Sequence, residues 1–148
     1  MRISTKGKYG LRAMVDLAVN SLDSPISLSS IAERQDLSLG YMEQVFSVLR
    51  KAGLVNSIKG AQGGYILADN PANITVGDVL RALEGDLNVV DEAEQQEANE
   101  KSIEYCIKTV VWDKMNESLN KVADSITLED LVTQYQKLSN SWVHMYYI

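Results

Sequence analysis

A change of hydrophobic period near residue 54 is the feature that most restricts what this chain can fold into. Before it, apolar residues recur at helical spacing in three segments between residues 5 and 52. After it come two short β-branched and aromatic runs, 54–58 and 64–67, on either side of the glycine-rich segment 59–63. Helical spacing predicts amphipathic helices, and two short apolar runs around a glycine-rich tip predict a β-hairpin. The order predicts a mainly α fold, a winged helix-turn-helix.

Residues that favour N-cap positions stand just before each predicted helix. Ser4 or Thr5 precedes the first segment, Ser27 the second and Ser38 the third. Each side-chain oxygen can accept a hydrogen bond from an unpaired backbone N–H of the first turn. Gly53 follows the third segment, where a residue free to adopt positive φ ends a helix. In helix-turn-helix motifs the second helix lies in the major groove of DNA, so we expect the helix from Ser38 onward to read bases.

The remainder of the chain divides by composition. A fourth helix after Thr75 completes a DNA-binding domain of residues 1–85. Residues 86–101 are acidic with few large apolar groups, and we expect a loosely held effector loop there. We assign 102–138 as a dimerisation helix region and 139–148 as a C-terminal tail. The long helix is apolar on two faces, so one face is expected to bury against a second copy of the chain. The stripe we assign to dimerisation is Ile107, Val111, Met115, Leu119 and Val122.

Composition excludes several classes of protein. At 148 residues the chain has the size of one domain. Its single cysteine, Cys106, excludes a disulfide framework and any all-cysteine metal site within one chain. No apolar run approaches the roughly 18 residues of a membrane span, and the N-terminus lacks a secretory apolar region. We therefore expect a cytoplasmic protein without a membrane partner.

The net charge of −6 argues against DNA binding, because DNA-binding domains are usually basic. This total combines two regions whose net charges have opposite signs. Residues 1–67 contain eight Lys/Arg and five acids, a net +3, whereas residues 68–148 contain six and fifteen, a net −9. Such asymmetry is typical of a polyanion-binding part joined to a part with another task, although a chance gradient over a solvated surface would give the same numbers.

The winged-helix assignment places three kinds of DNA contact. Polar side chains opening the third helix face base edges, the hairpin tip faces the minor groove, and nearby cations face phosphates. The alternative is that these residues form only the exposed side of a surface helix. For base readout we expect Ser38, Gly40, Tyr41, Glu43 and Gln44; for the wing, Lys59, Gly60 and Gln62; for phosphates, Lys6, Lys8, Tyr9, Arg50 and Lys51.

The glycine-rich tip has a rival interpretation as a phosphate-cradling nucleotide loop. It lacks the Lys-Ser/Thr pair and the following helix that such a loop needs, so we reject it. We can name no nucleophile–base pair and no metal cluster elsewhere. The sequence therefore predicts a protein that is not an enzyme, with no metal and no cofactor.

Six blocks of sequence, in this order and at these separations, resemble one known family. The blocks are residues 1–14, 41–46, 49–55, 60–65, 76–79 and 125–131. They resemble the Rrf-type bacterial transcription regulators, which include IscR-like and CymR-like members. The resemblance covers about residues 1–132 and fails only in the acidic middle. It implies a winged-helix homodimer on double-stranded DNA with a palindromic operator, in which the long helix crosses to the partner subunit.

IscR-like members hold an iron–sulfur cluster on three cysteines and a histidine. In this chain Cys106 aligns with the last cysteine, the other two cysteine positions fall near Glu94 and Glu100, and Thr109 replaces the histidine. One thiolate is a poor cluster site, so we predict a cluster-free regulator. An iron–sulfur regulator with an atypical ligand set is the alternative. Cys106 is then either a small buried hydrophobe or a redox switch.

CymR-like members, which control cysteine metabolism, lack the cluster cysteines and share the aromatic tail ending in isoleucine. A terminal Ile148 beside Tyr147 resembles the peptide that enters the active site of cysteine synthase. The alternative is a frayed terminus. The resemblance thus implies a dimeric repressor of cysteine and sulfur metabolism genes that works with cysteine synthase.

Overall fold

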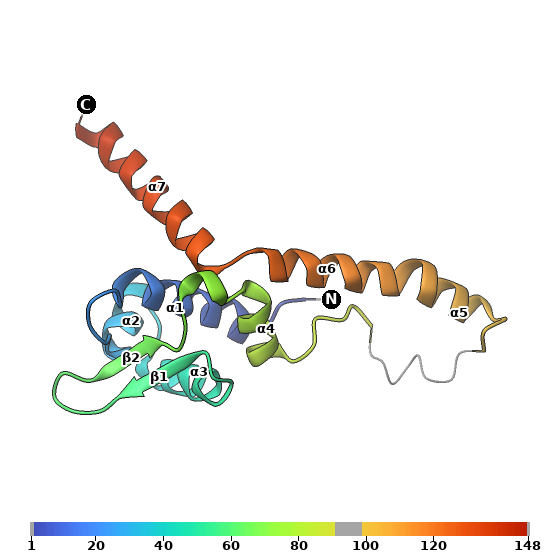
Figure 1. The fold of residues 1–148 in the computed structure, drawn as a ribbon, viewed down its shortest axis with the longest axis horizontal. Helices are drawn as coiled ribbons and strands as arrows, with labels where there is room; N and C mark the ends of the chain where they lie inside the picture. The colour runs from blue at the N-terminus through green and yellow to red at the C-terminus, as the bar shows by residue number, and fades with distance from the viewer. Residues whose placement is uncertain (1, 91–98, 148) are drawn as a thin grey trace.

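The computed structural model describes residues 2–90 and 99–147, with side chains to residue 141 (Figure 1). A helical N-terminal part carries one antiparallel hairpin and is followed by two helices that leave it in different directions. In chain order the elements are α1 (Thr5–Asn20), α2 (Leu28–Gln35), α3 (Leu39–Lys51), β1 (Val55–Ile58), β2 (Gly64–Leu67), the 3₁₀ turn η1 (Pro71–Asn73), α4 (Val76–Glu84), α5 (Ile103–Ile107), the π turn η3 (Lys108–Trp112), α6 (Asp113–Ser125) and α7 (Leu128–Tyr147).

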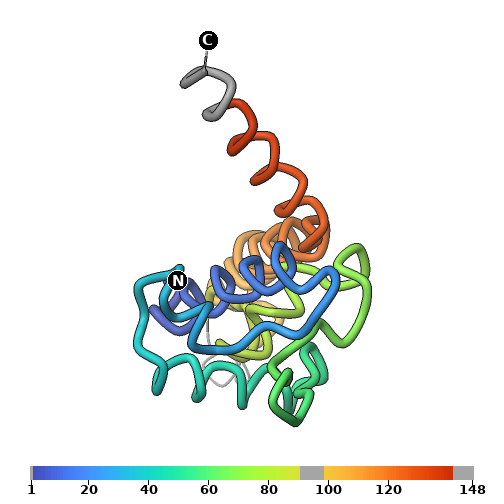
Figure 2. Tube along the Cα trace, turned by 90° about the vertical axis from the view of Figure 1, so that its left-hand side faces the viewer, coloured from blue at the N-terminus to red at the C-terminus, as the bar shows by residue number. Residues whose placement is uncertain are grey.

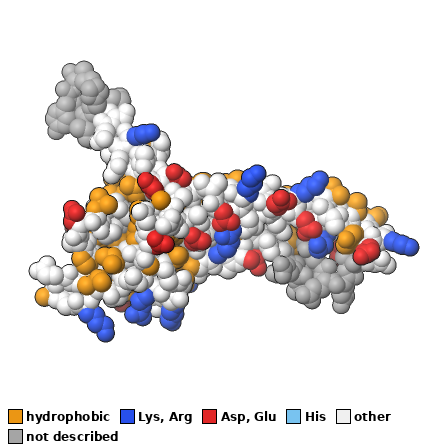
Figure 3. Space-filling view, in the orientation of Figure 1, with side chains coloured by type: hydrophobic (Ala, Val, Ile, Leu, Met, Phe, Trp, Pro, Cys, Tyr) orange, Lys and Arg blue, Asp and Glu red, His pale blue; other side chains and the backbone are white. Residues whose placement is uncertain are grey.

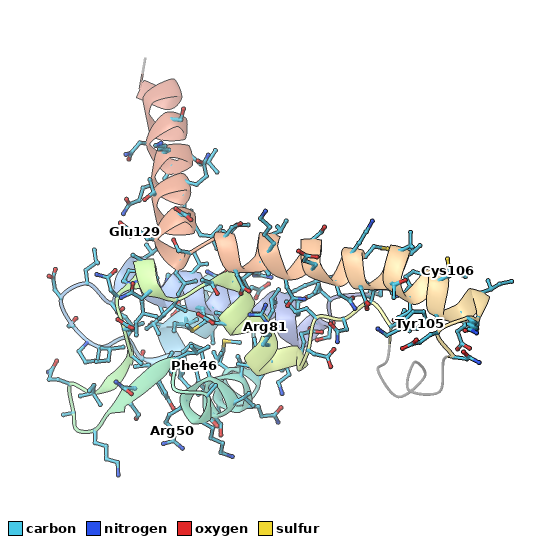
Figure 4. All side chains as sticks on the ribbon, turned by 45° about the vertical axis from the view of Figure 1, so that its right-hand side comes forward. Phe46, Arg50, Arg81, Tyr105, Cys106 and Glu129 are labelled. Atoms are coloured by element: carbon cyan, nitrogen blue, oxygen red, sulfur yellow. The ribbon has the colours of Figure 1, made fainter. Side chains whose placement is uncertain are left out.

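The core lies where α1, α2 and α3 meet. Phe46, labelled in Figure 4, is fully buried, and the ring of Tyr65 from β2 packs on it edge-to-face with centroids 5.1 Å apart. The hairpin therefore closes one side of the helical core through an aromatic pair, which stabilises beyond the apolar area it buries. The other large side chains with no exposed surface are Met14, Leu17, Ile31, Met42, Leu49, Leu128, Val45, Val55 and Val79.

The predicted caps are confirmed. The hydroxyls of Ser4, Ser27 and Ser38 each accept a hydrogen bond from the backbone N–H three residues on. Thr75 caps α4 in the same way and forms a reciprocal capping box with Asp78. Because these bonds join residues only three apart, the starts of four helices can be predicted from the local sequence.

α4 joins the DNA-binding part to the long helix. On one side it meets α1 so closely that a Cβ on Gly10 would collide with Leu83. On the other side Arg81 donates two hydrogen bonds to Asp124 of α6, at 2.6 and 2.9 Å. A Cβ on Gly77 would collide with the same carboxylate. α4 is therefore in close contact with both α1 and α6.

The segment after α4 differs from our expectation of a loosely held loop. Leu87 is buried, and the N–H of Val89 donates to Asn116 of α6 at 2.8 Å. Residues 86–90 are thus packed along the long helix, while 91–98 lie outside the described residues. α5, η3 and α6 follow one another as one long helix with a π turn in its middle (Figure 1). No sequence pattern indicated that turn.

The C-terminal helix α7 leaves the body at a steep angle to the long helix (Figures 1 and 2). The hydroxyl of Thr127 accepts from Asp130 N–H, as expected of its cap. The sequence predicts a separate tail from residue 139, but the backbone stays helical from Leu128 to Tyr147. Ile148 and the side chain of Tyr147 lie outside the described residues. Among those that are described, no helix is both long and apolar enough to span a bilayer.

Candidate nucleic-acid interface

α3 has one buried and one exposed face. Met42, Val45 and Phe46 are fully buried, whereas Glu43 and Gln44 between them point to solvent. Gly40 is also exposed, and a Cβ placed on it would meet no atom of the described chain within 4 Å. The core thus fixes the rotation of α3 and presents three of the five expected base-reading residues.

The other two expected readers have structural tasks as well. The Ser38 hydroxyl accepts the Tyr41 N–H at 3.1 Å as the cap of α3. Tyr41 is half-buried, and its ring packs edge-to-face on Tyr9 of α1 with centroids 6.2 Å apart. The guanidinium of Arg12 lies over the same Tyr9 ring at 5.1 Å. Two residues predicted for different kinds of contact, Tyr9 and Tyr41, are therefore joined in one cluster beside the start of α3.

The wing forms as predicted. Residues 59–63 connect β1 to β2, with Val55 paired to Leu67 at one end and Ile58 to Gly64 at the other. Gly60 has φ +114°, a conformation that favours glycine. Its neighbours along the tip are solvent-facing, and the exposed set includes Lys59, Gly60 and Gln62.

Cations line the lower edge of the winged part. Figure 1 places α3 and the hairpin side by side there, and Figure 3 shows Lys and Arg side chains gathered along that edge. Arg50 and Lys51 are exposed in the last turn of α3, and Figure 4 shows Arg50 pointing away from the body. Lys59 at the wing tip is exposed as well. The electrostatics of this edge suit a polyanion.

The predicted phosphate contacts on α1 differ in their exposure to solvent. Lys6 is half-buried. Lys8 is exposed and lines a groove toward α7, together with Arg12, which is not among the predicted phosphate contacts. Arg12 Nη2 donates to the main-chain oxygen of Gln35, the last residue of α2, at 2.7 Å.

A buried carboxylate organises the same region. Asp16 sits on the inward face of α1 with a side chain 2% exposed, and Arg34 of α2 pairs with both its oxygens at 2.8 and 2.9 Å. Gln35 Nε2 donates to Asp16 at 2.9 Å. The hydrogen bonds that Arg34 donates to the Asp16 carboxylate raise the pKa of Arg34. The signal available in the sequence was an acid among the apolar positions of the first helix.

The stripe expected to dimerise is open in the single chain. Met115 is 47% and Val122 58% exposed, large fractions for apolar side chains spaced along one helix. Ile107 and Val111 are also exposed, and Leu119 is half-buried. A hollow of about 480 Å³ lies along this face, lined by Val89, Val110, Val111, Lys114, Met115, Ser118 and Leu119. An apolar patch of this kind marks an interaction surface.

Comparison with known proteins identifies the family. The Rrf2 model, described as that of an iron-dependent transcriptional regulator, matches residues 3–134. The chain belongs to the Rrf2 family. The HTH-type transcriptional regulator CymR of Bacillus subtilis (strain 168) is 45% identical over 133 residues, which are 90% of this chain and 91% of the relative.

Two solved structures share the fold. CymR (YrzC), the global cysteine regulator of B. subtilis, matches with a TM-score of 0.77 and 42% identity, over 90% of this chain and 98% of the other. T. potens IscR matches with a TM-score of 0.73 and 46% identity, over 93% and 90%. The expected Rrf2 fold and family are thus confirmed, and the protein is a transcriptional regulator whose relatives are regulators rather than enzymes.

The residues of this Rrf2 chain do not fit an iron–sulfur cluster. Cys106 is its one cysteine, and cluster ligation needs several thiolates. The Thr109 hydroxyl donates to the main-chain oxygen of Tyr105 at 3.1 Å. Glu100 is exposed, and Glu94 lies outside the described residues. Within the described parts no group of three His, Cys, Asp or Glu side chains could hold a metal ion.

Cys106 is exposed in the single chain, on the outer part of the long helix (Figure 4). Its own subunit does not bury the thiol, and burial of this small hydrophobe against a second copy of the chain stays a prediction. The stripe residue Ile107 follows it directly.

Proposed function

We propose that this Rrf2 regulator binds a palindromic operator as a homodimer, with α3 in the major groove and the wing at the minor groove. The observation that carries the proposal is the exposed face of α3. Glu43 and Gln44 have free side-chain groups, with no hydrogen bond to any other described residue. Glutamine can pair bidentately with adenine, and glutamate can accept from cytosine N4.

The surrounding cations support this orientation. Arg50, Lys51 and Lys59 are exposed near α3 or at the wing tip. Contacts from these residues would fix the register on the duplex without reading sequence. The net charge of −9 on residues 68–148 lies mostly in the half that faces the partner subunit in this arrangement. It therefore reduces the affinity for DNA only slightly.

The open stripe on the long helix supports the homodimer. A two-fold pair would bury Met115 and Val122 against their counterparts, since an isologous interface uses the same patch twice. The dimer would also place two copies of α3 on half-sites about one helical turn, roughly 34 Å, apart. An operator with that spacing is therefore the expected target.

We further propose that the operators control genes of cysteine and sulfur metabolism and that the regulator is a cluster-free repressor. The support is the similarity to B. subtilis CymR, the global cysteine regulator, together with the single cysteine. Recovery of bound sites across the genome, with and without sulfur starvation, tests this. Sites upstream of sulfur genes that empty on starvation are expected, and their absence from such genes would remove the assignment.

Cysteine synthase is the proposed protein partner, bound through the C-terminal end that contains Tyr147 and Ile148. The aromatic composition of residues 142–147 favours an interface. The continuous helix to Tyr147 means that the last turn has to unwind if the end enters a pocket as an extended peptide. A variant lacking Ile148 should lose the complex in size-exclusion chromatography while keeping operator affinity. A complex that survives the deletion would show that the end is not the contact.

A further inference from the structure

A groove between α1, the end of α2 and α7 has the composition of a ligand site. Its volume is about 620 Å³, within the roughly 300–1,000 Å³ typical of small-molecule pockets. Leu11, Val15 and Val19 of α1 form one wall, and Leu131 and Tyr135 of α7 form the other. Tyr135 is 52% exposed although it faces apolar neighbours, so part of this surface has no cover within the described chain.

The polar lining of the groove is positive. It contains Lys8, Arg12, Arg34 and one acid, Asp16. Arg34 forms the ion pair with Asp16, which leaves the charges of Lys8 and Arg12 without a carboxylate partner among the described residues. The hydrogen bonds of Arg12 go to neutral oxygens of Gln35, and its guanidinium retains donors for another acceptor. Two available cations beside apolar walls are complementary to an amphipathic anion.

We propose that this groove binds a small organic carboxylate with an apolar body, and that its binding weakens operator affinity. The carboxylate would accept hydrogen bonds from Lys8 and Arg12. The apolar part would lie between Val15 and Leu131, where it gains from leaving water.

The coupling to DNA follows from what Arg12 contacts. Arg12 donates to the main-chain oxygen of Gln35, which ends α2 one turn before α3 begins. It also covers Tyr9, whose ring packs on Tyr41 in the first turn of α3. A bound carboxylate would draw Arg12 off both partners and neutralise cations on α1. Operator affinity at saturating ligand should fall by about tenfold, within the usual range for linked sites. This second step rests on the proposed DNA-binding function, whereas the binding step does not.

The test uses the full-length protein and 4-phenylbutyrate as the probe, with 4-phenylbutanol as its uncharged counterpart. Methyl NMR signals of Val15 and Leu131 should shift with 4-phenylbutyrate, with a Kd of about 1 mM or tighter. Arg12→Gln should weaken binding of the acid about tenfold and leave the alcohol unchanged. Lys137→Gln, which changes an exposed lysine of α7 outside the groove, should alter neither.

Three results would overturn the proposal. In the first, the NMR signals of the groove methyl groups do not shift with 4-phenylbutyrate. In the second, they shift only in a monomeric Met115→Glu variant, because a second copy covers the groove in the dimer. In the third, they shift but operator affinity is unchanged at saturating ligand. Failure of the protein to bind its operator without ligand is a separate outcome, and it would count against the proposed function instead.

Discussion

Replacement of Gln44 by alanine separates base reading from folding. The Gln44 side chain is exposed and makes no hydrogen bond within the described chain, so its removal breaks nothing in the monomer. Alanine is also the stronger helix former by a few tenths of a kcal/mol. The free energy of unfolding should therefore stay the same or rise slightly. A bidentate pair with a base contributes about 1–3 kcal/mol of discrimination, so each half-site should lose that amount. A symmetric operator read by two copies would lose about 2–6 kcal/mol in total.

Fluorescence anisotropy at one fixed salt concentration measures this loss on the operator and on random DNA of equal length. The operator Kd should rise strongly and the random-DNA Kd should not. A double-mutant cycle then substitutes, in both half-sites, the base pair that Gln44 reads; the wild type should lose affinity and Gln44→Ala should not lose it again. Arg50→Ala is the matched control on the same helix. It should weaken both DNAs alike and reduce the steepness of the salt dependence. Equal losses on both DNAs for Gln44→Ala would refute its role as a reader.

Four further predictions follow from the same geometry. Lys59→Ala should weaken binding to many sequences alike in gel-shift titrations; a loss confined to one operator variant would assign it base readout instead. Met115→Glu should give a folded monomer by analytical ultracentrifugation, because that side chain is exposed in the single chain and a charge is costly only in the interface; a stable dimer would show that another face associates. The hydrogen bonds from Arg81 hold the pKa of Asp124 below its ordinary value, so their contribution to stability is present above about pH 4 and is lost as pH falls through the lowered pKa; Arg81→Gln should flatten that acid-side loss in thermal melts, and an identical profile would contradict this. Protein purified without oxygen should be colourless because Cys106 is the one thiol in the chain; visible absorbance with bound iron would reverse that conclusion.

What the sequence predicted well depends on short-range contacts. The caps at Ser4, Ser27 and Ser38 each join residues three apart, and the hairpin joins strands separated by a five-residue tip. The buried and exposed faces of α3 likewise follow from the 3.6-residue period. These signals lie within one element or one turn, so a single sequence displays them.

What the sequence missed depends on long-range contacts. Val89 meets Asn116, 27 residues on, which is why composition alone indicated a loose segment there. Arg12 is not among the predicted phosphate contacts because it is held by Gln35, 23 residues further along the chain, and only the packing of α1 on α2 brings the two together. A charged residue on a helix is normally solvated, and nothing in its own neighbourhood in the sequence distinguishes one that is held.

The position of α4 explains how a mainly acidic half can serve a DNA-binding half. α4 contacts α1 closely at Gly10 and α6 closely at Gly77, where an added Cβ would displace the side-chain ends of Leu83 and Asp124. Arg81 adds hydrogen bonds to Asp124 and Asn120 across the second contact. These exposed bonds stabilise the fold only modestly, but they fix direction. In the proposed dimer the distance between the two copies of α3 would be set through this connection. Specificity for one half-site spacing would then come from steric fit at two glycines rather than from any residue that touches DNA.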